Sequence, residues 1–314
     1  MIDLKTVKQV DERLLRKVLK LEPFIGHTPL YPIETVYRKR NVRIYAKLEW
    51  QQMGGSVKSR PAYEIIKQAI LSGELTSDTE LLDATSGNTG IAYATIGAAL
   101  GISVTLCLPS NASETRKKLL TGLGVNIVYT SAFDNTDGAQ IEAKKLKAEF
   151  PDRFFYADQY ANDNNWKAHY NGTGVEALDQ TKNAITHFVS ALGTTGTFTG
   201  TGRRLKAENS AIHLTSLQPD SILHGLEGWK HLETAIVPKF YDATLADANL
   251  EVSTEAAVEL IKSVAKKEGL LISPSAAANL AGAIQVAETI NEGTIVTIFP
   301  DNAEKYGEVI DELF

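Results

Sequence analysis

ELLDATSGNTGIAYATIGAAL, residues 80–100, passes from an apolar run through a glycine-rich turn into a helical pattern. The run Leu81–Ala84 has the character of a buried strand, and Ile91–Leu100 has the character of a helix. The turn between them, Ser86–Gly90, would aim backbone N–H groups and a helix N-terminus at an anion. This stretch therefore predicts a strand, an anion-binding loop and a helix in direct succession.

The same alternation continues along the chain. Candidate strands are the apolar runs 43–48, 80–84, 103–108, 125–129, 185–190, 213–217 and 294–299. Candidate helices are the amphipathic stretches 11–21, 61–72, 89–100, 113–123 and 137–149. This order predicts an α/β fold in which helices cover both faces of mostly parallel sheet.

Composition bounds the class of protein. The 314 residues carry a net charge of -6, with 43% hydrophobic and 22% charged residues, which is typical of a globular protein with a sizeable core. The mildly acidic balance offers no basic face for nucleic acid or an anionic membrane. The start lacks a signal-peptide pattern, and no apolar run approaches membrane-spanning length. We therefore expect a cytoplasmic protein without nucleic-acid or membrane partners.

Neither the histidines nor the single cysteine indicates a metal site or a disulfide. The six histidines show no metal-ligand spacing, and His187 lies within an apolar run. Cys107 lies in the apolar run 102–108, where a small buried side chain is favoured over a nucleophile. No metal is predicted.

A second glycine-rich loop and a lysine extend the pattern. GTTGT, residues 193–197, follows the apolar run 185–190 and suits a phosphate dianion, but lacks the Gly-Lys-Ser/Thr ending of a nucleoside-triphosphate loop. Lys58 follows the small residues 54–56, which let the backbone pass close to a flat ring. Taken singly, each loop also fits a capped helix start, and Lys58 also fits an exposed lysine after a turn. Together they predict a bound phosphate, a bound carboxylate and a reactive amine, which suit an enzyme acting on amino acids with pyridoxal phosphate.

In order and approximate spacing, the lysine segment and the two loops resemble those of the cysteine synthase and cystathionine β-synthase family of fold-type II pyridoxal-phosphate enzymes. The resemblance covers nearly the whole chain, from Gly26–Leu30 to Phe299–Asp301. Thr89 and Gly90 after Ser-Gly-Asn favour this branch over the serine and threonine dehydratases. With Thr195 at its third position, the loop 193–197 resembles that of the B-type, or M-like, subgroup of cysteine synthases.

The resemblance implies a tryptophan synthase β-like fold with two open, twisted, mostly parallel sheets covered by helices. A smaller, mobile substrate-binding domain, residues 44–150, is expected as an insertion in a larger cofactor-binding domain made of 1–43 and 151–314. The cofactor is expected in the cleft, at the carboxyl ends of strands. A homodimer is also implied, with the N-terminal helix packed on the partner subunit.

The matching positions imply a role for each site residue. Lys58 is expected to bind pyridoxal phosphate as a Schiff base and then to act as general base. The cofactor-binding set is completed by Gly193, Thr194, Thr195, Gly196 and Thr197 for the phosphate, Asn88 for the phenolic oxygen and Ser275 for the ring nitrogen. The substrate carboxylate is expected to bind Thr85, Ser86, Gly87, Thr89 and Gln159. Ser275 also fits the N-cap of the following helix, and Gln159 also fits an ordinary loop residue.

The implied reaction is a β-replacement on an amino-acid substrate. An O-activated L-serine, with O-acetylserine favoured, loses its β-substituent to give an α-aminoacrylate, and sulfide or a sulfur carrier adds to form L-cysteine. Segment 218–225 contains Asp220 and no arginine, which argues against O-phosphoserine. O-phosphoserine sulfhydrylase, cystathionine β-synthase or another β-substituted alanine synthase remains open.

Departures from the family pattern leave a catalytically silent relative open as well. Ser59 stands where the family usually has aspartate, which removes a carboxylate that could pair with Arg60. An extra Pro274 precedes Ser275, and Ala276-Ala277 follows it without the usual glycine. The presence of Lys58 argues for an active enzyme.

Overall fold

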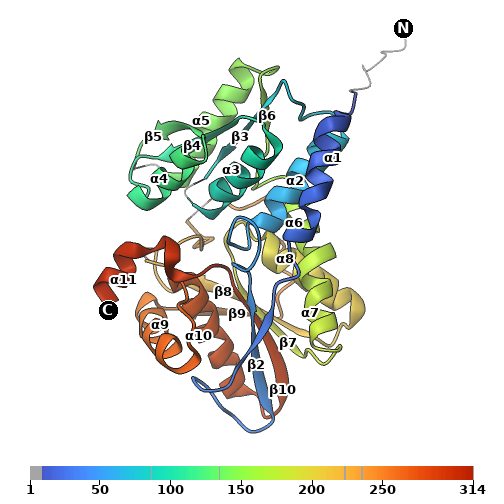
Figure 1. The fold of residues 1–314 in the computed structure, drawn as a ribbon. Helices are drawn as coiled ribbons and strands as arrows, with labels where there is room; N and C mark the ends of the chain where they lie inside the picture. Colours follow the sequence, from blue (N-terminus) through green and yellow to red (C-terminus); the bar gives the residue numbers. More distant parts are fainter. Residues whose placement is uncertain (1–8, 86, 134, 223, 235, 314) are drawn as a thin grey trace. The chain divides into compact units, whose positions relative to one another are not determined.

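The computed structural model describes residues 9–85, 87–133, 135–222, 224–234 and 236–313. The chain divides into two compact units, each built on its own sheet (Figure 1). The smaller unit comprises the residues up to 25 and 62–158, and the larger unit comprises 26–61 and 159–314. Both sheets are mostly parallel and pack against helices, which confirms the predicted α/β fold.

The larger unit contains a six-stranded sheet in the order β1-β2-β10-β7-β8-β9. Its strands are β1 (Leu30–Ile33), β2 (Val42–Leu48), β7 (His187–Ala191), β8 (His213–Pro219), β9 (Ala248–Val252) and β10 (Gly293–Phe299). All neighbours pair in parallel except β1 and β2, which are antiparallel. The parallel core brings the carboxyl ends of β2, β7 and β10 to one edge of the sheet, where loops bearing polar residues follow.

Helices pack on both faces of this sheet because its central strands are apolar on both sides. In β10, Ile295 and Phe299 belong to one core cluster, whereas Val296 and Ile298 belong to another. The first cluster includes residues of α9 (Thr254–Glu268) and α10 (Pro274–Thr289), and the second includes residues of α7 (Gly174–Gln180) and α8 (Gly196–Glu208). The other helical elements are α6 (Asn164–Ala168), a π-helix (His169–Thr173), a 3-10 turn (Ala303–Lys305) and α11 (Gly307–Leu313).

The smaller unit contains a four-stranded parallel sheet in the order β5-β4-β3-β6. Its strands are β3 (Glu80–Ala84), β4 (Val104–Pro109), β5 (Asn126–Thr130) and β6 (Phe154–Tyr156). Its helices are α1 (Glu12–Leu21), α3 (Asn88–Leu100), α4 (Glu114–Gly122) and α5 (Asn135–Glu149), and a 3-10 turn (Glu22–Phe24) follows α1. The helix α2 (Ser59–Leu71) begins in the larger unit and ends in the smaller one. One face of the sheet packs against α1, α2 and α3, and the other packs against α5.

The two units differ from the expected domains at the N-terminal side. β2 pairs along its whole length with β10, so the segment from residue 44 to 61 belongs to the larger unit rather than to the smaller domain. α1 packs in the core of the smaller unit through Leu14 and Val18, and Lys17 Nζ donates to Leu100 O at 2.5 Å. These contacts bury Leu14 and Val18 within the chain, and the expected packing of this helix on a partner subunit stays a prediction.

Cys107 is buried in β4, as predicted. Burial raises the pKa of its thiol to about 12, which keeps the sulfur protonated near neutral pH and therefore poorly nucleophilic. Across the described ranges, no helix combines the length and the apolar character needed to cross a membrane.

Candidate active site

Lys58 lies at the end of a turn that joins β2 to α2. Gly54 and Gly55 both adopt left-handed backbone angles, with φ of +84° and +63°. Ser56 Oγ then accepts a hydrogen bond from Lys58 N at 3.3 Å, and Val57 N donates to Pro300 O at 2.8 Å. The turn follows β2 directly, so the lysine lies near the carboxyl end of a parallel strand.

The Lys58 amine has the protonation behaviour of a reactive lysine. Burial lowers its pKa to about 8, and the negative charge of Asp301 partly opposes this shift. About half of the amine is therefore neutral near pH 8. A neutral amine at this pH can act as a nucleophile or accept a proton.

A buried ion cluster anchors the first turn of α2, two residues after Lys58. Arg60 Nε donates to Glu49 Oε2 at 2.6 Å, and Arg60 Nη1 donates to Glu176 Oε1 at 2.6 Å. Lys47 Nζ lies 2.6 Å from Glu176 Oε2, which gives two cations and two carboxylates in contact. Although burial alone would raise it, Arg60 and Lys47 hold the pKa of Glu176 well below its usual range.

In this cluster, Glu49 and Glu176 supply the carboxylates that pair with Arg60, so an aspartate at position 59 is not needed for that pairing. Ser59 is fully buried, and the guanidinium of Arg60 already has both carboxylates. A Cβ on Gly26 would lie 2.8 Å from Arg60 Nη1, so glycine there lets the backbone approach the guanidinium. The helix that follows Lys58 is therefore fixed by Glu49 and Glu176, which are distant in the sequence.

The loop 193–197 has the form of a phosphate cradle at the start of α8. Thr195 adopts a left-handed conformation, with φ of +66°, at the N-cap of this thirteen-residue helix. Its hydroxyl oxygen is buried, and no group in the described part of the chain hydrogen-bonds it. A Cβ on Gly193 would lie 2.2 Å from Gly228 O. An unpaired hydroxyl in a glycine-lined loop at a helix N-terminus fits the phosphate of the expected cofactor.

Gly196→Ala is expected to weaken binding of pyridoxal phosphate at least about tenfold, which corresponds to roughly 1.4 kcal/mol. The added Cβ would lie 2.0 Å from Asn165 Oδ1, so either the loop or the Asn165 side chain must move. Titration of the apoprotein with pyridoxal phosphate measures the change. Gly122→Ala is a matched control because its Cβ would meet nothing within 4 Å. Equal affinity in the Gly196 variant and the control would contradict the role of this loop.

His169 contacts this loop, although it is not among the site residues predicted from the sequence. Its Nε2 lies 3.3 Å from Thr197 Oγ1, and its Nδ1 lies 2.9 Å from Thr173 Oγ1. Burial, followed by the charges of Arg60 and Lys58, lowers the pKa of His169 well below its usual value, so the ring is neutral. The residue begins the π-helix 169–173, an element that often occurs at functional sites.

Asn165 makes a second connection within the larger unit. Its Nδ2 donates to Gln159 O at 2.7 Å and to Thr194 Oγ1 at 3.2 Å. Gln159 is buried and follows Asp158, which has a φ of +45°. The predicted substrate residue Gln159 and the predicted phosphate loop therefore share one supporting side chain.

Ser275 lies in the first turn of α10 but does not cap it. The cap is Ser273, whose side chain accepts from Ala276 N, and Pro274 occupies the first turn, where its missing N–H is harmless. Ser275 Oγ donates to Glu227 O at 2.5 Å. A hydroxyl has one hydrogen to donate, so that hydrogen must turn away from Glu227 to reach a ring nitrogen.

The remaining predicted substrate residues lie in the smaller unit, in the loop after β3 and the first turn of α3. Thr85 and Thr89 are buried, Asn88 is partly buried, and Gly87 N donates to Thr85 Oγ1 at 3.2 Å. Ser86 lies outside the described residues. The buried guanidinium of Arg116 lies beside this loop, since a Cβ on Gly87 would be 3.4 Å from Arg116 Nη1. Arg116 is not among the site residues predicted from the sequence, because the approach of α4 to this loop has no local signal.

The fold and these side chains define a cofactor-dependent enzyme of the α/β class. The chain belongs to the pyridoxal-phosphate dependent enzymes, whose family model matches residues 21–301. The donor set described above fits that cofactor: an amine of lowered pKa, a glycine-rich loop at a helix N-terminus and an unpaired threonine hydroxyl.

Comparison with individual proteins agrees with this family. A cysteine synthase of Aquifex aeolicus is 43% identical over 296 residues, which cover 92% of this chain and 90% of the relative. The crystal structure of a cysteine synthase from Entamoeba histolytica is 28% identical with a TM-score of 0.85, covering 98% of this chain and 96% of that one. An O-acetylserine dependent cystathionine β-synthase from Helicobacter pylori is 31% identical with a TM-score of 0.85, covering 91% and 96%.

Proposed function

We propose that this enzyme makes L-cysteine from O-acetyl-L-serine and sulfide by β-replacement. The proposal is supported by one observation above all: the larger unit contains both the buried amine of Lys58 and a glycine–threonine loop with an unpaired buried hydroxyl at the start of α8. The names of the Aquifex and Entamoeba proteins support the same activity.

Each residue of the larger unit has a defined task in this proposal. Lys58 holds pyridoxal phosphate and, once released by the substrate, takes the proton from the α-carbon as general base. Residues 193–197 hold the phosphate, and Ser275 meets the ring nitrogen. When bound, the cofactor would stabilise the electron pair left at the α-carbon after proton removal, and that pair would then form a double bond to the β-carbon as the β-substituent leaves.

The substrate carboxylate is assigned to Thr85, Ser86, Gly87 and Thr89 of the smaller unit and to Gln159 of the larger unit, with Asn88 at the cofactor's phenolic oxygen. Backbone N–H groups at the start of α3 and the two buried threonine hydroxyls support this assignment, because they are donors suited to an anion. The B-type subgroup, the mobility of the smaller domain, the homodimer and the cytoplasmic location stay predictions. Light scattering of the purified protein tests the dimer.

The visible absorption spectrum tests the reaction. The purified protein is expected to have an absorption band from bound pyridoxal phosphate that changes on addition of O-acetyl-L-serine and returns on addition of sulfide, with release of L-cysteine. O-phosphoserine is expected to leave the band unchanged, since segment 218–225 contains Asp220 and no arginine. A colourless protein that stays colourless with added pyridoxal phosphate would contradict the enzyme assignment.

The second candidate function is the formation of cystathionine from the same O-acetylated substrate. The similarity to the Helicobacter pylori enzyme favours it, because that protein's name combines O-acetylserine with cystathionine synthesis. Homocysteine replaces sulfide in a parallel assay of the same preparation. A higher kcat/KM with homocysteine than with sulfide would transfer the proposal to this second reaction.

A further inference from the structure

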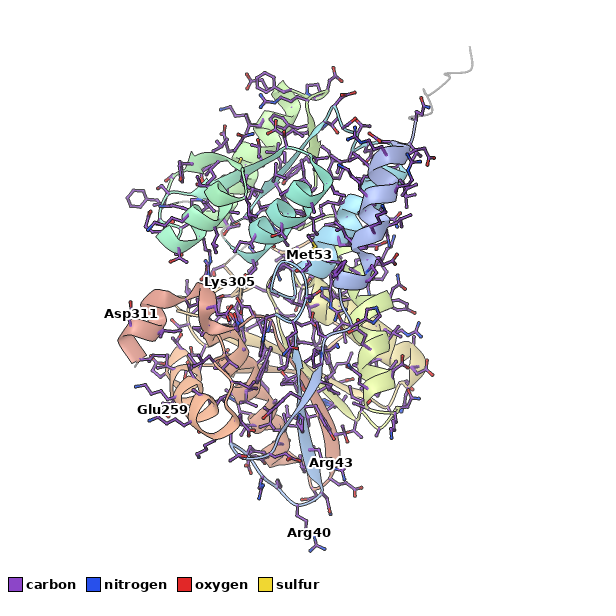
Figure 2. All side chains as sticks on the ribbon, in the orientation of Figure 1. Arg40, Arg43, Met53, Glu259, Lys305 and Asp311 are labelled. Atoms are coloured by element: carbon purple, nitrogen blue, oxygen red, sulfur yellow. The ribbon has the colours of Figure 1, made fainter. Side chains whose placement is uncertain are left out.

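The turn that bears Lys58 is tied to a segment near the C-terminus, Pro300–Tyr306. Val57 N donates to Pro300 O at 2.8 Å. Lys305 Nζ donates to two consecutive carbonyl oxygens, that of Gly54 at 3.3 Å and that of Gly55 at 2.8 Å. In Figure 2 the labelled Lys305 and Met53, the residue before Gly54, lie on the same side of the larger unit. The turn is therefore held by a residue that is 250 positions further along the chain.

The bonds from Lys305 add to the turn's own hydrogen bonds, such as that from Gly55 N to Gln52 O at 2.9 Å, and restrain two residues with an unusually wide choice of conformations. Gly54 and Gly55 are consecutive glycines with positive φ, and glycine has the largest choice of backbone conformations. Holding them in one conformation costs conformational entropy. An ammonium that bonds both carbonyls selects one arrangement of the turn, and a charged donor makes these hydrogen bonds stronger than neutral ones.

Hydrogen bonds hold the backbone segment that contains Lys305. It ends the 3-10 turn Ala303–Lys305, in which Tyr306 N donates to Ala303 O at 2.9 Å. Ala303 N donates to Leu271 O at 3.0 Å, and the Tyr306 hydroxyl donates to Asp301 Oδ2 at 2.7 Å. The backbone that bears the Lys305 side chain is therefore held in place within the larger unit.

The contact differs from ordinary capping by a surface lysine. Lys39 Nζ also donates to two carbonyl oxygens, those of Ala287 and Glu288, but these lie at the C-terminal end of α10, where cations commonly satisfy the last carbonyls. The carbonyls bound by Lys305 belong to no helix. They belong to the turn that leads directly to Lys58.

We propose that Lys305 is a positioning residue for Lys58: its ammonium holds the Gly54–Gly55 turn in the conformation that presents the Lys58 amine to pyridoxal phosphate. This inference rests on the proposed function only in its assignment of Lys58 as the residue that binds the cofactor.

Hydrogen exchange of the apoprotein tests the effect on the turn without cofactor or substrate. In Lys305→Met, the amides of residues 54–59 are expected to exchange about tenfold faster than in the wild type, because the turn opens more often. Lys39→Met, which loses the matching pair of bonds at α10, is expected to leave these amides unchanged. Lys305→Arg keeps a cation with several donors and is expected to restore most of the protection.

Borohydride trapping of pyridoxal phosphate on Lys58 tests the effect on the amine. The second-order rate of trapping is expected to fall about tenfold in Lys305→Met, to stay unchanged in Lys39→Met and to recover in Lys305→Arg. If Lys305→Met fails to fold, Lys305→Gln serves in both measurements, since it keeps a neutral donor and is expected to have an intermediate effect.

The outcomes separate this inference from the proposed function. Exchange and trapping rates in Lys305→Met within twofold of the wild type would overturn the inference, as would equal changes in Lys39→Met. Wild-type protein that traps pyridoxal phosphate at Lys58 but makes no L-cysteine would refute the proposed reaction and leave this inference standing. Trapping at another lysine would refute the assignment of Lys58, and the inference with it.

Discussion

Lys58→Ala is expected to lower the rate of L-cysteine formation by at least roughly 10²-fold, within the range that one side chain contributes in general acid–base catalysis. The variant lacks the amine that holds pyridoxal phosphate and accepts the α-proton in the proposed reaction. Steady-state assays with O-acetyl-L-serine and sulfide measure the loss. The same preparation is expected to yield no cofactor at position 58 after borohydride reduction.

Three further measurements test whether the loss of activity in Lys58→Ala comes from the missing amine, whose pKa is lowered by burial. Because burial disfavours the charged lysine, its removal is expected to leave the thermal midpoint of the apoprotein unchanged or higher, which excludes unfolding as the cause. A small primary amine added to the variant is expected to restore part of the rate. In the wild-type apoprotein, trapping is expected to speed up as pH rises through about 8, since the neutral amine is the nucleophile and its pKa lies there. Wild-type turnover in Lys58→Ala would remove this lysine from the mechanism.

Most of the sheet could be predicted from the sequence because its central strands are apolar on both faces. β3, β4, β8 and β10 all occur within two residues of the predicted runs. The strands that the sequence analysis missed, β1, β6 and β9, all lie at sheet edges. β1 and β6 are only four and three residues long, and β9 alternates polar with apolar residues, so none of them has an apolar run of the usual length for a buried strand.

The local sequence pattern of β2 could not predict that this strand belongs to the larger unit. β2 is an apolar run like its neighbours, and nothing within residues 42–48 indicates that it pairs with 293–299. Such pairing depends on contacts between segments that are distant in the sequence. The expected boundary at residue 44 came from the family resemblance, whereas the contacts of this chain move it to about residue 61.

The candidate site shows the same division between local and long-range information. Both loops and Lys58 have local signals, namely glycines after an apolar run. Their supporting residues, His169, Asn165 and Arg116, have none, because each acts through a partner in another element. The sequence also could not show which carboxylates pair with Arg60 when position 59 is serine, because they come from Glu49 and Glu176.

Arg60→Met is expected to lower the free energy of unfolding by roughly 3–5 kcal/mol, the usual cost of removing one partner from a buried ion pair. The change leaves Glu49, which is fully buried, without its guanidinium, and leaves Glu176 with Lys47 as its cation. Urea unfolding of the apoprotein measures the loss. Lys145→Met is the matched control, because its pair with Glu142 is partly exposed and 3.5 Å long, and such pairs contribute about 0–1 kcal/mol.

The pH dependence of unfolding separates this electrostatic cause from lost packing. A carboxylate with a lowered folded-state pKa stabilises the protein above its unfolded-state pKa, and this contribution disappears as pH falls through the folded-state pKa. Arg60 holds the pKa of Glu176 low, so in Arg60→Met that pKa rises and acid unfolding is expected to begin at higher pH. Adding Glu49→Gln to Arg60→Met is expected to recover part of the stability, because the buried carboxylate that has lost its guanidinium is replaced by a neutral amide. An unchanged acid limb in Arg60→Met, together with no recovery in the double variant, would mean that the guanidinium stabilises the turn after Lys58 by its volume alone.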